Sequence, residues 1–190
     1  MKRIVLSIAV LVGTNILFPV SPAAAQPSFE QIVKKAEAKF EPADAKPGQT
    51  VTLKVTLQLL DGWHTYPLFQ PDKAAKTYIN KITFPEAGPL VYVGELNDPK
   101  GAKEKAEPLA SIERMLVYPG GATWEFTAVV LPTTKAGPVS SKIKFRVLVC
   151  DKDNCVPPTT IDIEATLKVA GEPVKVDPKY QKDVDKALKK

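Results

Sequence analysis

Residues 142–169 read KIKFRVLVCDKDNCVPPTTIDIEATLKV, and this stretch decides the fold. Apolar and polar residues alternate over Lys142–Cys150 and again over Thr160–Val169, which is the period of a half-buried β-strand. Between the two segments, Asp151–Asn154 consists of polar residues that favour a turn. The pattern therefore predicts an antiparallel hairpin whose end carries Cys150 and Cys155, the only two cysteines of the chain.

The same alternation recurs along the rest of the chain. Thr50–Leu59 and Thr123–Leu131 repeat it clearly, and prolines and glycines fall between the alternating segments. Weaker strands are predicted at Lys35–Phe40, Tyr78–Phe84, Leu90–Gly94 and Glu113–Tyr118. Short strands separated by turns predict an all-β, antiparallel β-sandwich of about 7–9 strands.

Three segments depart from this pattern. Residues 26–34 are expected to form a loose N-terminus before a single domain over residues 35–170. Asn97–Ser111 is polar and interrupted by prolines, so it is interpreted as a long loop. Residues 171–190 form a charged tail, in which a short helix is expected because Tyr180, Val184 and Leu188 recur every four residues.

The first 25 residues have the features of a secretory signal peptide. A basic start, an apolar stretch and the small residues Ala23–Ala25 follow in the expected order, so we expect cleavage near Ala25 and export to the periplasm. Removing Lys2 and Arg3 leaves 24 basic residues (26 minus 2) against 21 acidic ones, a net charge of +3. This charge is too small to indicate nucleic-acid binding, and no later stretch is apolar enough to predict a membrane span.

Apart from the cysteine pair, the sequence contains few residues in a pattern typical of a catalytic or metal-binding site. His64 is the single histidine, so a zinc or copper site with Cys150 and Cys155 would lack a fourth ligand, and no metal or cofactor is predicted. The segment WHTYPLF, residues 63–69, gathers three aromatic residues. They are interpreted either as core packing or as a cluster that lines the cysteine site.

The spacing of the cysteines leaves two interpretations open. A Cys150–Cys155 bridge closes a ring of six residues, for which chain entropy gives only about 2 kcal/mol of stabilisation. It would also join strands that a hairpin already holds. An accessible bridge at a hairpin end favours exchange chemistry, whereas a structural staple in a non-enzymatic binding module remains the alternative.

Two segments resemble a known family. CDKDNCVPP after the strand IKFRVLV, and PGQTVTLKVTLQLLDGWHTYP at Pro47–Pro67, resemble the N-terminal domain of the thiol:disulfide interchange protein DsbD. The resemblance covers roughly Lys35–Val169. It implies an immunoglobulin-like sandwich in the periplasm, with a cysteine pair that takes electrons from a thioredoxin-like donor and passes them to periplasmic disulfide-handling proteins. Because this chain stops at Lys190, the donor is expected to be separate.

The resemblance also implies roles for individual residues. Cys155 would form mixed disulfides with partners, Cys150 would be the resolving cysteine, and Tyr66 would lie near the pair. The family's cap loop matches about Leu96–Ile112, which has no aromatic residue, so the resemblance implies a more exposed pair or a different partner. Further residues expected to line the site are His64, Trp63, Pro157 and Leu109.

Overall fold

The structure is a computed structural model that describes residues 27–107 and 111–189. The expected signal peptide and Leu109 lie outside the described residues. The strands are β1 (Val33–Glu41), β2 (Asp44–Ala45), β3 (Thr50–Leu59), β4 (His64–Thr65), β5 (Lys81–Thr83), β6 (Leu90–Val93), β7 (Lys103–Glu107), β8 (Ile112–Pro119), β9 (Gly121–Val130), β10 (Gly137–Cys150) and β11 (Cys155–Val169). The helices are α1 (Phe29–Ile32), η1 (Lys73–Ala75), η3 (Pro178–Tyr180) and α2 (Gln181–Ala187).

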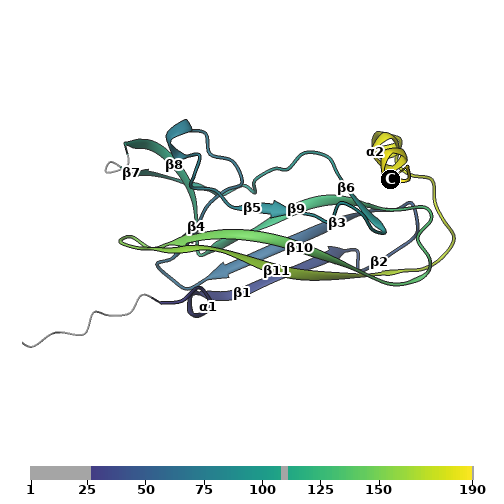
Figure 1. The fold of residues 1–190 in the computed structure, drawn as a ribbon, viewed down its shortest axis with the longest axis horizontal. Coiled ribbons are helices and arrows are strands. Elements are labelled where there is room, and N and C mark those ends of the chain that lie inside the picture. Colours follow the sequence, from purple (N-terminus) through teal and green to yellow (C-terminus); the bar gives the residue numbers. More distant parts are fainter. Residues whose placement is uncertain (1–26, 108–110, 190) are drawn as a thin grey trace, which may run out of the picture.

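The strands form two sheets that pack face to face as a sandwich (Figure 1). One sheet has the order β1-β3-β9-β6, and the other has the order β2-β11-β10-β4-β8-β7, with β5 also pairing with β10. All pairs are antiparallel except β2 with β11. The predicted antiparallel, immunoglobulin-like β-sandwich with a short C-terminal helix is confirmed.

Period-two alternation produces the core between the sheets. Every second residue of β3, from Val51 to Leu59, is buried, while the residues between them reach the surface. Trp124 of β9 is fully buried and makes edge-on ring contacts with Tyr118 and Phe145 of the opposite sheet. Burial of these apolar and aromatic side chains is the dominant stabilising term of the fold.

Two segments have more regular structure than the sequence predicts. The expected long loop Asn97–Ser111 contains β7, which pairs with β8. The expected loose N-terminus contains α1, whose Phe29 and Ile32 are buried. Both were missed because neither gives a clear apolar pattern: α1 has only four residues, and β7 has a single apolar residue, Ala106.

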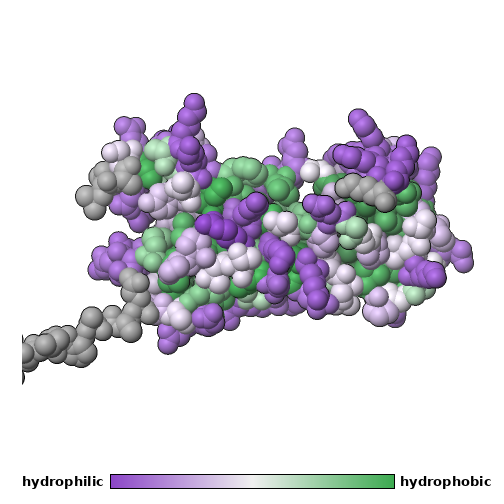
Figure 2. All heavy atoms as spheres, in the orientation of Figure 1, coloured by the Kyte–Doolittle hydropathy of each residue, from purple (hydrophilic) through white to green (hydrophobic). Residues whose placement is uncertain are grey.

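The C-terminal tail is held on the sandwich at the end opposite the tip of the β10–β11 hairpin (Figure 1). Val184 of α2 is fully buried and packs in one cluster with Val93, Val129 and Val176. Elsewhere, hydrophilic side chains are spread over the face seen in Figure 2, with apolar side chains between them. Among the described residues, every helix is too short or too polar to span a membrane.

Candidate redox site

The site is built on the end of the β10–β11 hairpin. The two strands pair from Gly137 and Val169 to Cys150 and Cys155, which face each other with their Cα atoms 4.0 Å apart and form a disulfide. The hairpin therefore brings the two sulfur atoms together as the sequence predicts. The Cα separation lies just below the roughly 4.4–6.8 Å usual for disulfides.

The turn that joins the cysteines is fixed by one carboxylate. Asp151 N donates to the carbonyl of Asn154 at 2.9 Å. In return, Asp151 Oδ1 accepts hydrogen bonds from the backbone N–H groups of Asp153 at 2.7 Å and Asn154 at 2.6 Å. These hydrogen bonds lower the pKa of Asp151, because they stabilise the charged carboxylate. The turn is thus a local device that holds the two cysteines in register.

The two cysteines differ in their access to solvent. Cys150 is only 2% exposed and packs in a small apolar cluster with Tyr66, Met115 and Leu148. Cys155, in contrast, is exposed. A nucleophile from solvent therefore reaches Cys155 more readily than Cys150.

A bulge lies immediately behind the cysteines. Val149 pairs with Val156 but Val147 pairs with Thr159, so Pro157 and Pro158 together oppose the single residue Leu148. Proline has no N–H group to donate to the sheet, and a bulge is one of the few sites where it is tolerated. The double proline thus ends regular pairing close to the disulfide.

On the edge of β10 that faces β4 and β5, side chains replace strand pairing at Leu148. β10 pairs with β5 up to Arg146 and with β4 from Val149 onward, and Leu148 lies in the gap. Its N–H donates to Asn80 Oδ1 at 3.0 Å, and its carbonyl accepts from Thr65 Oγ1 at 2.9 Å. Asn80 is itself 1% exposed. This buried junction fixes the strand that carries Cys150.

The Asn80 junction also holds the segment that carries Tyr66. Asn80 Nδ2 donates to the carbonyl of Tyr66 at 2.6 Å and to Thr65 Oγ1 at 2.9 Å. Gln70 acts similarly on the neighbouring strand, because its side-chain amide both accepts from and donates to the backbone of Leu116. Among described residues, no buried side-chain nitrogen or oxygen lacks a hydrogen bond. The site is therefore held by side-chain amides as well as by sheet pairing.

Tyr66 and His64 form a buried pair beside Cys150. His64 lies opposite Cys150 in the β4–β10 pairing, and its Nε2 shares a hydrogen bond of 3.3 Å with the Tyr66 hydroxyl. Burial lowers the pKa of His64 to about 4, with the charge of Lys105 adding to the effect, and it raises the pKa of Tyr66. At neutral pH both side chains are therefore uncharged.

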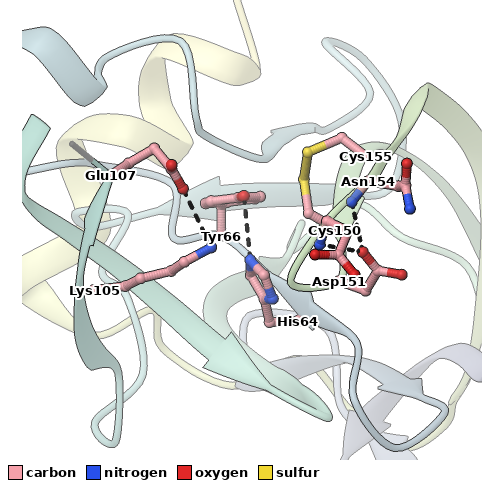
Figure 3. A network of polar contacts seen from close by, with 9 residues as sticks. His64, Tyr66, Lys105, Glu107, Cys150, Asp151, Asn154 and Cys155 are labelled. Atoms are coloured by element: carbon pink, nitrogen blue, oxygen red, sulfur yellow. Dashed lines mark hydrogen bonds and ion pairs between the residues drawn. A yellow bond between two sulfur atoms is a disulfide. The ribbon is translucent and has the colours of Figure 1, made fainter. Parts of the chain in front are cut away.

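A pocket of about 480 Å³ opens directly over the disulfide. Both cysteines line it together with Tyr66 and Tyr78, and β7 contributes Lys105 and Glu107, whose side-chain charges lie 3.4 Å apart. In the view of Figure 3, this ion pair lies on one side of Tyr66 and the disulfide on the other. The remaining lining residues are Asp151, Lys152, Asp153 and Asn154.

The structure brings only some of the residues that the sequence singled out to the pocket. Tyr66 lines the pocket, and His64 lies behind it. Trp63 packs against the main core instead, and Pro157 lies at the bulge, so neither belongs to the pocket lining. The aromatic segment is thus split, with Phe69 57% exposed. Leu109 lies outside the described residues.

Sequence reasoning missed the part of the pocket wall formed by Tyr78, Lys105 and Glu107. The alternation of Lys105 and Glu107 about Ala106 was the available signal, but it lies within the segment interpreted as a loop.

The interpretation of the site as a metal centre gains no support. Within residues 27–107 and 111–189, no three His, Cys, Asp or Glu side chains are grouped to hold a metal ion, and disulfide sulfurs are not thiolate ligands.

No curated protein matches the chain. The N-terminal periplasmic domain of ScsB from Proteus mirabilis is 14% identical, with a TM-score of 0.44 over 80% of this chain; the chain spans about half of that structure, 52%. The PapD-like domain 7 of human CEP192 is 12% identical, with a TM-score of 0.28 over 87% of this chain and 99% of that one. These similarities are too weak to indicate a function.

The family comparison is more informative. The family model described as thiol:disulfide interchange protein DsbD, N-terminal, matches residues 29–167. This range includes both cysteines and every residue that lines the pocket. It also agrees with the extent of the resemblance noted in the sequence. The chain therefore belongs to the family of DsbD N-terminal domains, the N-terminal domains of thiol:disulfide interchange proteins.

Proposed function

We propose that this protein is an exported thiol–disulfide exchange domain that passes electrons through the Cys150–Cys155 pair. A thioredoxin-like protein or domain in the periplasm supplies the electrons, and periplasmic disulfide-handling proteins receive them. Membership of the DsbD N-terminal family supports this proposal, as does the disulfide within the pocket.

The observation that carries the proposal is the unequal exposure of the two cysteines. Cys155 is exposed at an open pocket, whereas Cys150 is 2% exposed beneath it. An exchange domain needs one sulfur that a partner can attack and a second that stays close enough to resolve the mixed disulfide. A staple needs no such difference, and this six-residue ring contributes only about 2 kcal/mol.

The reaction consists of two exchanges. A thiolate of the donor attacks Cys155 Sγ, a new disulfide forms between the donor and Cys155, and the bonding electrons of the old disulfide leave on Cys150 Sγ. The second thiolate of the donor then attacks the donor's own bridged sulfur and releases Cys155. Two electrons have moved, the donor is a disulfide, and Cys150 and Cys155 are reduced. The same steps in reverse deliver the electrons to an acceptor.

Trapping of mixed disulfides tests this function. In the Cys150→Ser variant the resolving thiol is absent, so a partner in the native cell envelope should remain bound to Cys155 through a bond that reductant cleaves. The matched Cys155→Ser variant retains only the buried sulfur and should trap far less. Equal trapping by both variants, or none by either, would contradict the proposal.

A binding module with a structural disulfide is the second candidate, and one observation favours it. Phe69 is 57% exposed, while Leu68 and Phe69 N–H groups are both held by the Asp98 carboxylate at 2.7 and 3.0 Å. A large apolar side chain on a fixed backbone suits a contact with another protein. Under this candidate, a Phe69→Ala variant loses partner binding and removal of both cysteines does not.

A further inference from the structure

The release of Cys150 poses an electrostatic problem. When a partner thiolate attacks Cys155, the negative charge appears on Cys150, whose side chain lies among Tyr66, Met115 and Leu148. A thiolate in apolar surroundings is poorly solvated, so the pKa of its thiol rises and it becomes a poor leaving group. Rapid exchange therefore requires a nearby group that stabilises the negative charge.

The turn side of the pocket does not provide a well-placed cation. Lys152 is a cation, but its side chain is 88% exposed and pairs with Asp153, which is 65% exposed. Charges so accessible to water have weak effects, because the solvent screens them. Asp151 is an anion that the turn N–H groups already hold. These groups do not favour a thiolate on Cys150.

The remaining walls contribute one cation that is partly shielded from water. Lys105 and Glu107 of β7 have side chains 33% and 30% exposed and form an ion pair. Tyr66 and Tyr78 bring no charge, and His64 is neutral above about pH 4. The charge of Lys105 lowers the pKa of His64, the direct cross-strand neighbour of Cys150, against the opposing charges of Asp151 and Glu107. Lys105 and Cys150 line the same pocket on opposite sides of Tyr66, so the positive charge lies across that ring from Cys150.

We propose that Lys105 stabilises the Cys150 thiolate as it leaves the disulfide, a role that rests on the exchange function proposed above. The lysine acts across Tyr66, where the low local dielectric strengthens the attraction between the two charges. Glu107 holds the lysine in place and partly offsets its charge. Lys105 is therefore the residue of β7 that sets the rate of disulfide exchange and the reduction potential of the Cys150–Cys155 pair.

A titration of Cys150 alone tests this role without any partner. In a Cys155→Ser background, thiolate absorbance against pH gives the pKa of the Cys150 thiol. Lys105→Gln should raise that pKa by about half a unit or more, and Lys105→Arg, which keeps the charge, should restore it. Lys103→Gln is the matched control, because Lys103 is an exposed cation on the same strand that does not line the pocket. Equal shifts for Lys103→Gln and Lys105→Gln would overturn the proposal.

Two further measurements distinguish the effect of Lys105 from that of Glu107, and the failure of this proposal from the failure of the proposed function. With both cysteines present, dithiothreitol should reduce the disulfide of Lys105→Gln several times more slowly than that of the wild type. The difference should persist in a Glu107→Gln background; if it vanishes there, the effect belongs to the unpaired carboxylate and the proposal is wrong. Because dithiothreitol replaces the donor, these results stand even if no cellular partner is trapped.

Discussion

The interior of the sandwich and the disulfide end of the molecule are built in different ways. Around Trp124 the two sheets pack through fully buried apolar side chains, and the indole N–H donates to Asp98. Around Cys150 the apolar cluster is small, strand pairing is interrupted at Leu148, and Asn80 and Gln70 take over the hydrogen bonds. The first region is stabilised by the burial of apolar surface area. The geometry of the second region depends on a few polar contacts.

This difference indicates what each region can tolerate. Apolar packing is non-directional and fixes a fold through many weak contacts. A junction of side-chain amides is directional, so it places particular atoms, but the loss of one group leaves others unpaired. The sandwich therefore acts as the rigid base for a site whose geometry depends on few residues.

Removal of the central indole should cause the largest loss. Trp124→Ala leaves a cavity between the sheets, and we expect the free energy of unfolding to fall by about 3–5 kcal/mol. Urea unfolding measures the change. Phe69→Ala is the control, because that ring is 57% exposed, and it should alter stability by less than about 0.5 kcal/mol. A loss below about 1 kcal/mol for Trp124→Ala would show that the interior is not the main source of stability.

Acid should weaken the disulfide end through His64. The pKa of His64 is about 4 in the folded protein, against 6.5 for the free side chain. The unfolded state therefore binds the proton more tightly than the folded state. The contribution of neutral His64 to the free energy of unfolding is fully present above pH 6.5 and is lost as the pH falls toward 4. The loss should amount to about 3 kcal/mol.

Urea unfolding of the wild type and of His64→Gln at several pH values checks this expectation. The variant has no group to protonate at this position, so its stability should fall less over the same interval. Parallel pH curves for the two proteins would contradict the assignment.

Loss of the amide junction should be slightly less costly. Asn80→Ala leaves the Leu148 N–H and the Tyr66 carbonyl without their buried partner, and we expect a loss of about 2–3 kcal/mol. Amide hydrogen exchange should show faster exchange at Leu148 than in the β3–β9 pair. The exposed Asn97, changed to alanine, is the control. Uniform acceleration over the whole chain would mean that the junction is not local.

Removal of the disulfide should have the smallest effect on stability. With both Cys150 and Cys155 changed to alanine, unfolding should become easier by only about 2 kcal/mol, because the ring is short and the hairpin remains paired. Thiol–disulfide exchange with a thioredoxin-like donor should be lost completely. A loss of stability comparable to that of Trp124→Ala would identify the bridge as a structural staple.

The same contrast explains what could be predicted from the sequence. Period-two alternation was clear in β3, β9, β10 and β11, where strands bury one face, so the sandwich and the hairpin could be predicted. β7 could not, because four of its five residues are charged and only Ala106 is apolar, so its pairing with the adjacent β8 leaves no apolar alternation in the sequence. Lys105 and Glu107 were missed with it.

The residues behind the disulfide show a second limit. Tyr66 was expected near the cysteines from the family resemblance, and the pocket contains it. Trp63, three positions earlier, faces the main core, because successive residues of an extended chain point to opposite faces. Asn80 gave no signal, since a single asparagine before a strand does not reveal which backbone groups it will contact.

The reduction potential of the Cys150–Cys155 pair, measured by equilibration with thiol–disulfide buffers of known potential, tests the central claim most directly. An exchange domain requires a value above about −300 mV, within reach of thioredoxin-like donors. We expect such a value because the bridge is accessible at Cys155 and closes a short ring. A potential well below about −300 mV, in the range of inert structural disulfides, would contradict the account.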